Sequence, residues 1–168
     1  MPFYQKRLRL SPQDYRGRRI FLVTLCCERR AAIFSDASEA RRLVEHLIRM
    51  SAEHRYYLHA YCVMPDHVHF LCEGATADCD LLPFVETFKQ QTAYAFGKKS
   101  GARLWQKRFY DHILRPVETI EDVACYIWLN PVRKNLCATP SDYPFCGSQT
   151  IDWIRRARAE TSWTPIWK

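Results

Sequence analysis

The sequence lacks a long apolar segment. No run reaches the roughly 18 apolar residues that a membrane-spanning helix needs. The N-terminus also lacks the apolar core of a signal peptide, and the basic stretch 16–19 follows it instead. These two absences argue against a membrane protein and a secreted protein, so we expect a cytoplasmic one.

Paired cysteine spacing is absent as well. The chain has 8 cysteines, yet none of them form a Cys-x-x-Cys motif, and most lie within apolar runs. In a cytoplasmic chain this pattern favours small buried side chains with free thiols over disulfide bridges. A small zinc protein stays open as an alternative, although the missing cysteine pairs weaken it.

The sequence has fewer acidic than basic residues. The 168-residue chain has 25 Lys and Arg against 18 Asp and Glu, a formal net charge of +7. This surplus favours a polyanionic partner, because neutralised phosphates release their counterions. Basic residues interleaved with aromatic ones also suit single strands, whose unpaired bases stack on aromatic rings. A solvated charged face over core aromatics is the alternative. The candidates for phosphate contacts are Arg18, Arg19, Lys89, Arg103, Lys107, Arg108 and Arg115.

The hydrophobic pattern predicts strands and helices in a mixed order. The expected elements are a strand over 20–27, a helix over about 37–54, two strands on either side of Pro65-Asp66, a helix over about 82–99, a strand or extended segment over 104–114, and a helix that runs to about Leu129 and is stopped by Pro131. This order implies an α+β domain with a ferredoxin-like antiparallel sheet and helices packed on one face. We expect a single domain over residues 1–148 and a C-terminal tail over 149–168, either a short helix or partly mobile.

A His-x-His pair follows the turn at Pro65-Asp66. Side chains alternate along a strand, so His67 and His69 share one face while Val68 points to the other. Neutral imidazole is among the commonest metal ligands, and the pair can hold a divalent metal. By itself such a pair is more often a surface or hydrogen-bonded pair. Asp66 can orient one imidazole or simply form the turn.

The last expected helix carries Tyr126 and Asn130 one turn apart. Residues four positions apart lie on a shared helix face. The amide oxygen of Asn130 is a reasonable ligand for Mg²⁺ or Mn²⁺, and Tyr126 offers a phenolic oxygen. If this helix face meets the histidine face, the parts of a metal-assisted tyrosine nucleophile are present. The alternative is a core tyrosine and a helix C-cap asparagine before Pro131.

Three motifs together resemble a known family. They are Pro-Asp-His-Val-His at 65–69, Trp-Gln-Lys-Arg-Phe-Tyr-Asp-His at 105–112 and Tyr-Ile-Trp-Leu-Asn-Pro-Val-Arg at 126–133. In this order they resemble the REP-associated tyrosine transposases, which belong to the HUH single-strand endonucleases and are related to the small single-strand insertion-sequence transposases. The resemblance runs from about residue 19 to 148.

The resemblance implies a site and an activity. His67 and His69 correspond to metal-binding histidines, Asn130 completes the metal site, and Tyr126 corresponds to the catalytic tyrosine. The family fold is the HUH endonuclease fold, and the implied cofactor is a divalent metal, Mg²⁺ or Mn²⁺. The implied activity is nicking and strand transfer on single-stranded DNA beside palindromic hairpins, through a 5′-phosphotyrosine link. Such a protein would act in the cytoplasm, in association with the nucleoid.

Several roles stay open at this point. Asp111 and His112 lie in a family-like segment, where one of them can position substrate or move a proton, or make a structural hydrogen bond. The family includes obligate dimers and members that act as monomers, so the oligomeric state is undecided. A hairpin-binding module without catalytic activity is the second function that the sequence allows.

Overall fold

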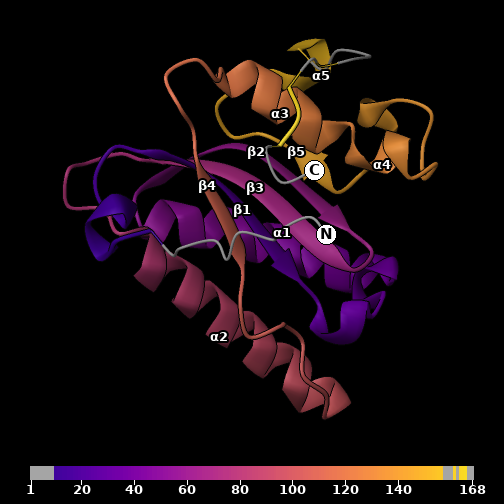
Figure 1. The fold of residues 1–168 in the computed structure, drawn as a ribbon. Coiled ribbons are helices and arrows are strands. Elements are labelled where there is room, and N and C mark those ends of the chain that lie inside the picture. Colours follow the sequence, from indigo (N-terminus) through magenta and orange to yellow (C-terminus); the bar gives the residue numbers. More distant parts are fainter. Residues whose placement is uncertain (1–9, 157–160, 162, 166–168) are drawn as a thin grey trace, which may run out of the picture.

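A computed structural model describes residues 10–156, 161 and 163–165 of the chain. Its centre is a five-stranded antiparallel sheet in the order β4-β1-β3-β2-β5 (Figure 1). The strands are β1 (Ile20–Cys26), β2 (Tyr56–Met64), β3 (His67–Gly74), β4 (Tyr110–Ile113) and β5 (Cys146–Gly147). The α+β class and the ferredoxin-like sheet are confirmed. The two-residue β5 is too short to leave a signal in the sequence.

Two long helices cover one face of the sheet. Helix α1 (Ala37–Glu53) begins where the Asp36 side chain accepts a hydrogen bond from the Ser38 backbone, and Asp80 caps α2 (Leu81–Ser100) in the same way. Both bury an apolar face against the side of the sheet that carries Val68. Gly101, with a φ of +67°, ends α2 in the left-handed conformation that glycine adopts without strain.

The third expected helix lies on the opposite side of the sheet. Helix α3 (Ile120–Trp128) is capped by Thr119, and its apolar side chains pack against β2 and β3 (Figure 1). Helix α3 ends at Trp128, next to the predicted end, and Pro131 occupies the first turn of a separate helix, α4 (Asn130–Arg133), where its missing N–H is no loss. The chain therefore continues close to α3 instead of leaving the sheet.

The C-terminal tail is partly described. The short helix α5 (Trp153–Arg156) falls inside the tail, and further along Thr161 donates a hydrogen bond to the Asp122 carbonyl oxygen at 3.2 Å. The rest of the predicted tail includes residues outside the described ranges (157–160, 162 and 166–168). Among the residues that the structure describes, no helix is long and apolar enough to cross a membrane. All eight cysteines have free thiols, and seven of them are buried.

Candidate active site

The two histidines of β3 lie on the face that α3 covers. His67 is opposite Cys26 and Met64 on the neighbouring strands, and His69 is opposite Thr24 and Cys62. Met64 and Cys62 belong to the apolar cluster beneath α3. The predicted alternation along the strand is confirmed, because Val68 lies in the cluster on the other face.

The two imidazoles converge on one point. Their Nε2 atoms are 3.0 Å apart, and the ring planes are nearly perpendicular. The Nδ1 atom of His67 lies 2.5 Å from a carboxylate oxygen of Asp66, and that of His69 lies 2.7 Å from the Thr24 hydroxyl. Arg30 holds the same Asp66 carboxylate at 2.9 Å. Each ring is thus oriented by a hydrogen bond on the side away from the point where the rings meet.

This arrangement fits a divalent metal. A carboxylate only accepts hydrogen bonds, so the Nδ1 atom of His67 carries the proton and its Nε2 presents a lone pair. The Thr24 hydroxyl can accept or donate, which lets His69 present either a lone pair or an N–H to His67. Two nitrogens bound at about 2.1 Å and at a right angle would lie about 3 Å apart. Burial lowers the pKa of His67, against the effect of Asp66, and favours the neutral form that binds metals.

Tyr126 and Asn130 lie together at the end of α3. The Asn130 amide nitrogen donates to the carbonyl oxygens of Tyr126 and Ile127, at 3.1 Å each. The amide oxygen is therefore the atom that remains for another partner. Within the described ranges, no three His, Cys, Asp and Glu side chains form a group that could hold a metal. Asn130 as a third metal ligand stays a prediction.

Arg133 connects the tyrosine to the histidine face. Its guanidinium lies 4.3 Å from the centre of the Tyr126 ring and donates to the Tyr126 carbonyl oxygen at 2.6 Å. Helix α3 packs on β2 and β3, α4 contacts β2, and Tyr126 is buried in one cluster with Cys62, the residue opposite His69. The α3–α4 segment and the histidine strand therefore meet within one chain. The sequence motif contains Arg133, but its role was not predicted, because the motif alone does not show where a flexible side chain points.

The C-terminal tail also reaches the tyrosine. The Trp163 ring packs edge-on against the Tyr126 ring, with the centroids 4.9 Å apart. Its indole N–H donates to the Glu118 carboxylate at 2.9 Å, and the same carboxylate binds the Nε2 atom of His112 at 2.9 Å. His112 is thus on the histidine face, and its Nε2 is engaged by Glu118. Sequence reasoning missed Trp163, because nothing in the tail indicates where it returns to the domain.

Glu118 should make the fold sensitive to acid. Burial alone would raise the pKa of its carboxyl, but hydrogen bonds from Arg115, Trp163 and His112 lower the pKa to about 2. A carboxyl whose pKa is lower in the folded chain than the unfolded value of about 4.3 stabilises the fold above that pH. This stabilisation is lost as the pH falls towards 2. Thermal unfolding of Glu118→Gln should therefore show a lower Tm than wild type at pH 7 and roughly half that loss of stability at pH 3, one unit above the folded pKa. An equal difference at both pH values would contradict this assignment.

Asp111 does not share the histidine face. On β4 it is opposite Val23, which belongs to the cluster under α1 and α2, whereas Tyr110 and His112 point to the α3 side. Strand alternation therefore separates Asp111 from its neighbours in the motif. A role for Asp111 beside His67 is not supported by this register.

The predicted phosphate contacts fall into separate groups. Arg18, Arg19 and Arg115 are exposed near the Ile20 end of β1, whereas Arg103, Lys107 and Arg108 are exposed near its Cys26 end. Arg103 and Lys107 line a pocket with α2, on the sheet face opposite the histidines. The two ends are roughly 20 Å apart over the length of this strand. Lys89 lies with this second group, and its ammonium donates to the carbonyl oxygens of Gln106 and Lys107 at 2.8 and 3.0 Å.

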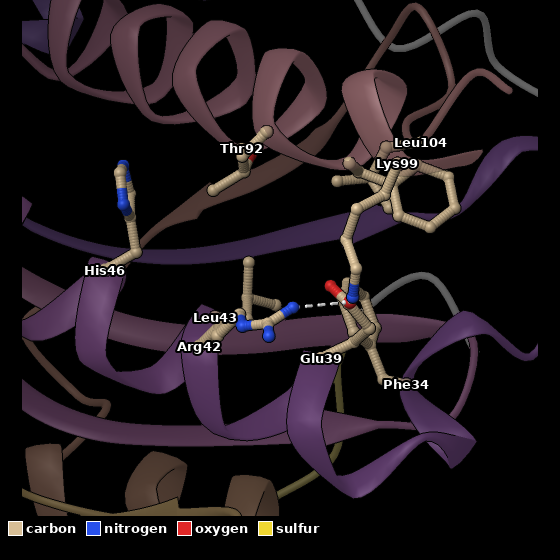
Figure 2. Close-up of a pocket in the computed structure, with 10 residues that line it drawn as sticks. Phe34, Glu39, Arg42, Leu43, His46, Thr92, Lys99 and Leu104 are labelled. Atoms are coloured by element: carbon tan, nitrogen blue, oxygen red, sulfur yellow. Dashed lines mark hydrogen bonds and ion pairs between the residues drawn. The ribbon is translucent and has the colours of Figure 1, made fainter. Parts of the chain in front are cut away.

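A small cavity lies between α1 and α2 (Figure 2). It has a volume of about 80 Å³ and lies on the sheet face opposite the histidines. The Glu39 carboxylate at its rim is already held by Arg42 at 2.8 Å and Lys99 at 2.7 Å. The candidate active site is the α3 face, where the histidine pair and Tyr126 lie.

Comparison with known proteins assigns the family. Residues 19–129 match the family described as "Transposase IS200 like". The chain belongs to this family. The match spans β1 to the end of α3 and so includes the histidine pair and Tyr126. The resemblance read from the three motifs is confirmed at the level of the family.

Individual relatives agree with this assignment. The chain is 28% identical over 115 residues to the "REP-associated tyrosine transposase" of Escherichia coli K12, which covers 64% of this chain and 68% of the relative. A Haemophilus influenzae relative is 25% identical over 97 residues, 51% of this chain and 55% of the relative. A solved structure of a REP-associated tyrosine transposase bound to a REP hairpin is similar in fold, with a TM-score of 0.68 and 24% identity over 83% of this chain and 80% of that one.

Proposed function

We propose that this IS200-like transposase nicks single-stranded DNA beside hairpins and stays linked to the 5′ phosphate through Tyr126. The observation that carries the proposal is the convergence of the His67 and His69 Nε2 atoms on the sheet face that Tyr126 also borders. We further propose that one chain supplies the whole site, because α3 packs on its own sheet. The domain would comprise residues 1–148, with the tail returning through Trp163.

The proposed reaction forms one bond, breaks one bond and moves one proton. The phenolic oxygen of Tyr126 forms a bond to the scissile phosphorus, the bond from phosphorus to the 3′ oxygen breaks, and the phenol's proton is finally carried by the 3′ hydroxyl. Trp163 and Arg133 pack on two parts of the Tyr126 ring and restrict its rotation. The covalent phosphotyrosine keeps the phosphodiester energy available for strand transfer, which hydrolysis would lose.

A divalent metal completes this proposal. His67 and His69 would hold it, with the Asn130 amide oxygen as a third ligand and Asp66 and Thr24 orienting the imidazoles. When bound, such an ion polarises the phosphate and stabilises the charge that develops during transfer. The family implies a divalent metal, and the mixed nitrogen and oxygen ligands suit Mn²⁺ and Mg²⁺.

Hairpin DNA is the substrate that the chain's charge favours. The net charge is +7, and Arg103, Lys107 and Arg108 are exposed near the Cys26 end of β1. A relative of the same fold has been solved with a REP hairpin bound. We propose that this chain likewise takes a palindromic hairpin with an unpaired flank, and that the unpaired flank enters the α3 face.

A nicking assay tests the proposed function. The full chain is incubated with an end-labelled strand carrying a hairpin from the flanks of its own gene, with Mn²⁺ or Mg²⁺, and the products are separated under denaturing conditions. We expect a shortened strand and a slow-moving protein–DNA adduct, both lost in EDTA. Hairpin binding without cleavage in either metal would show instead the non-catalytic binding module.

Tyr110 is expected to stack on an unpaired base. It lies opposite Thr24 on the histidine face and is 53% exposed, although its neighbours Trp105 and Phe109 pack into the core. Stacking of one base on an aromatic ring contributes about 1–3 kcal/mol, so Tyr110→Ala should weaken binding of the unpaired flank about ten-fold or more. Tyr110→Phe should bind as wild type does. Fluorescence anisotropy with flanked and blunt hairpins measures this, and an equal loss for both would contradict it.

A further inference from the structure

We infer that Arg133 binds the scissile phosphate beside Tyr126 and neutralises its charge while the phenolic oxygen attacks. This inference rests on the proposed function and adds a contact to the substrate that the family match does not assign. It makes Arg133 a catalytic residue, because its guanidinium would touch the reacting group.

The first argument is position. The guanidinium lies over the Tyr126 ring at 4.3 Å, and one of its N–H groups donates to the Tyr126 carbonyl oxygen at 2.6 Å. Arginine has five N–H donors in a fixed plane, a geometry that matches two phosphate oxygens at once. A phosphate that the phenolic oxygen can reach must lie at the edge of this same ring, within the length of an arginine side chain.

The second argument is charge. In the described part of the chain, Arg133 has no ion pair with a carboxylate, unlike Arg16, Arg30 and Arg55. Arg133 is exposed, so its guanidinium is accessible to a phosphate that arrives from solvent. Such a phosphate would supply the anion that no carboxylate of the described residues supplies.

A helix-capping role is the simpler explanation that the experiment must exclude. Arginines near the end of a helix often bond the last carbonyl groups, and Arg133 does so through one N–H. Capping would make Arg133 important for the fold, but it would not make its importance depend on the charge of the DNA phosphate.

The test therefore varies the residue and the phosphate together. Adduct formation by wild type, Arg133→Gln and Arg133→Lys is timed on a hairpin strand with either a normal scissile phosphate or a methylphosphonate, in which a methyl group replaces one charged oxygen. Arg49→Gln, an exposed ion-paired arginine on α1, is the matched control. Thermal unfolding of each variant monitors the fold.

The two explanations give different results. If Arg133 neutralises the phosphate, Arg133→Gln slows attack on the normal phosphate by about 100-fold or more and leaves the rate on the methylphosphonate nearly unchanged. Arg133→Lys keeps a charge without the planar fork and should lie in between. Equal slowing on both substrates, or no slowing on either, would overturn the inference. Absence of any adduct with wild type would instead refute the proposed function.

Discussion

Replacing Tyr126 by phenylalanine is expected to abolish the covalent protein–DNA adduct, with a rate loss of at least about a thousand-fold. The change removes the phenolic oxygen alone. The ring can still pack against Trp163 and Arg133, so the fold and hairpin binding should be nearly unchanged. The measurement is adduct yield against time on a hairpin strand, with binding affinity measured in parallel.

Tyr94 provides the matched control for this experiment. It lies on α2, is 68% exposed and is on the opposite side of the sheet from Tyr126. Tyr94→Phe loses the same hydroxyl and should form the adduct at the wild-type rate. A residual adduct in Tyr126→Phe that another tyrosine carries would contradict the assignment of the nucleophile.

Replacing His69 by alanine is expected to remove metal-dependent nicking, because a single imidazole would remain where two now converge 3.0 Å apart. We expect Mn²⁺ affinity, measured by calorimetry on the full chain, to fall by well over 100-fold. In Asp66→Asn, Mn²⁺ affinity should fall by about 10–100-fold, the usual effect of losing a hydrogen bond to a metal-binding histidine. This order follows from the contacts, since Asp66 acts only through His67.

His46 separates a metal effect from a general histidine effect. It lines the cavity between α1 and α2 on the other face of the sheet (Figure 2). His46→Ala should leave both Mn²⁺ affinity and nicking unchanged. Equal Mn²⁺ affinity for wild type and His69→Ala would show that the metal, if bound, is held elsewhere.

The fold and the central residues could be predicted because their signals are local. Period-two alternation placed His67 and His69 on one face, and helical spacing placed Tyr126 next to Asn130. The α+β class followed from the order of elements. Residues 110–112 show what such local signals cannot predict. Asp111 points away from the site because of the register in which β4 pairs with β1, and the motif itself does not determine this register.

The parts that sequence reasoning missed depend on long-range contacts. Trp163 reaches Tyr126 from 37 positions along the chain, and Thr24 supports His69 from another strand. Helix α3 ends close to the predicted residue, but the sequence did not predict that Pro131 would lie in the first turn of a further helix, α4, whose Arg133 lies over Tyr126. Proline restricts only its own φ and its hydrogen bond, so it cannot by itself show whether a chain leaves or restarts a helix.

The most direct test of the account is to identify the amino acid that carries the DNA. The adduct formed on a hairpin strand with Mn²⁺ is digested with protease and nuclease, and the nucleotide-linked peptide is sequenced by mass spectrometry. The account predicts a 5′-phosphate ester on Tyr126. A nucleotide on any other residue, or cleaved strands without a linked peptide, would contradict it.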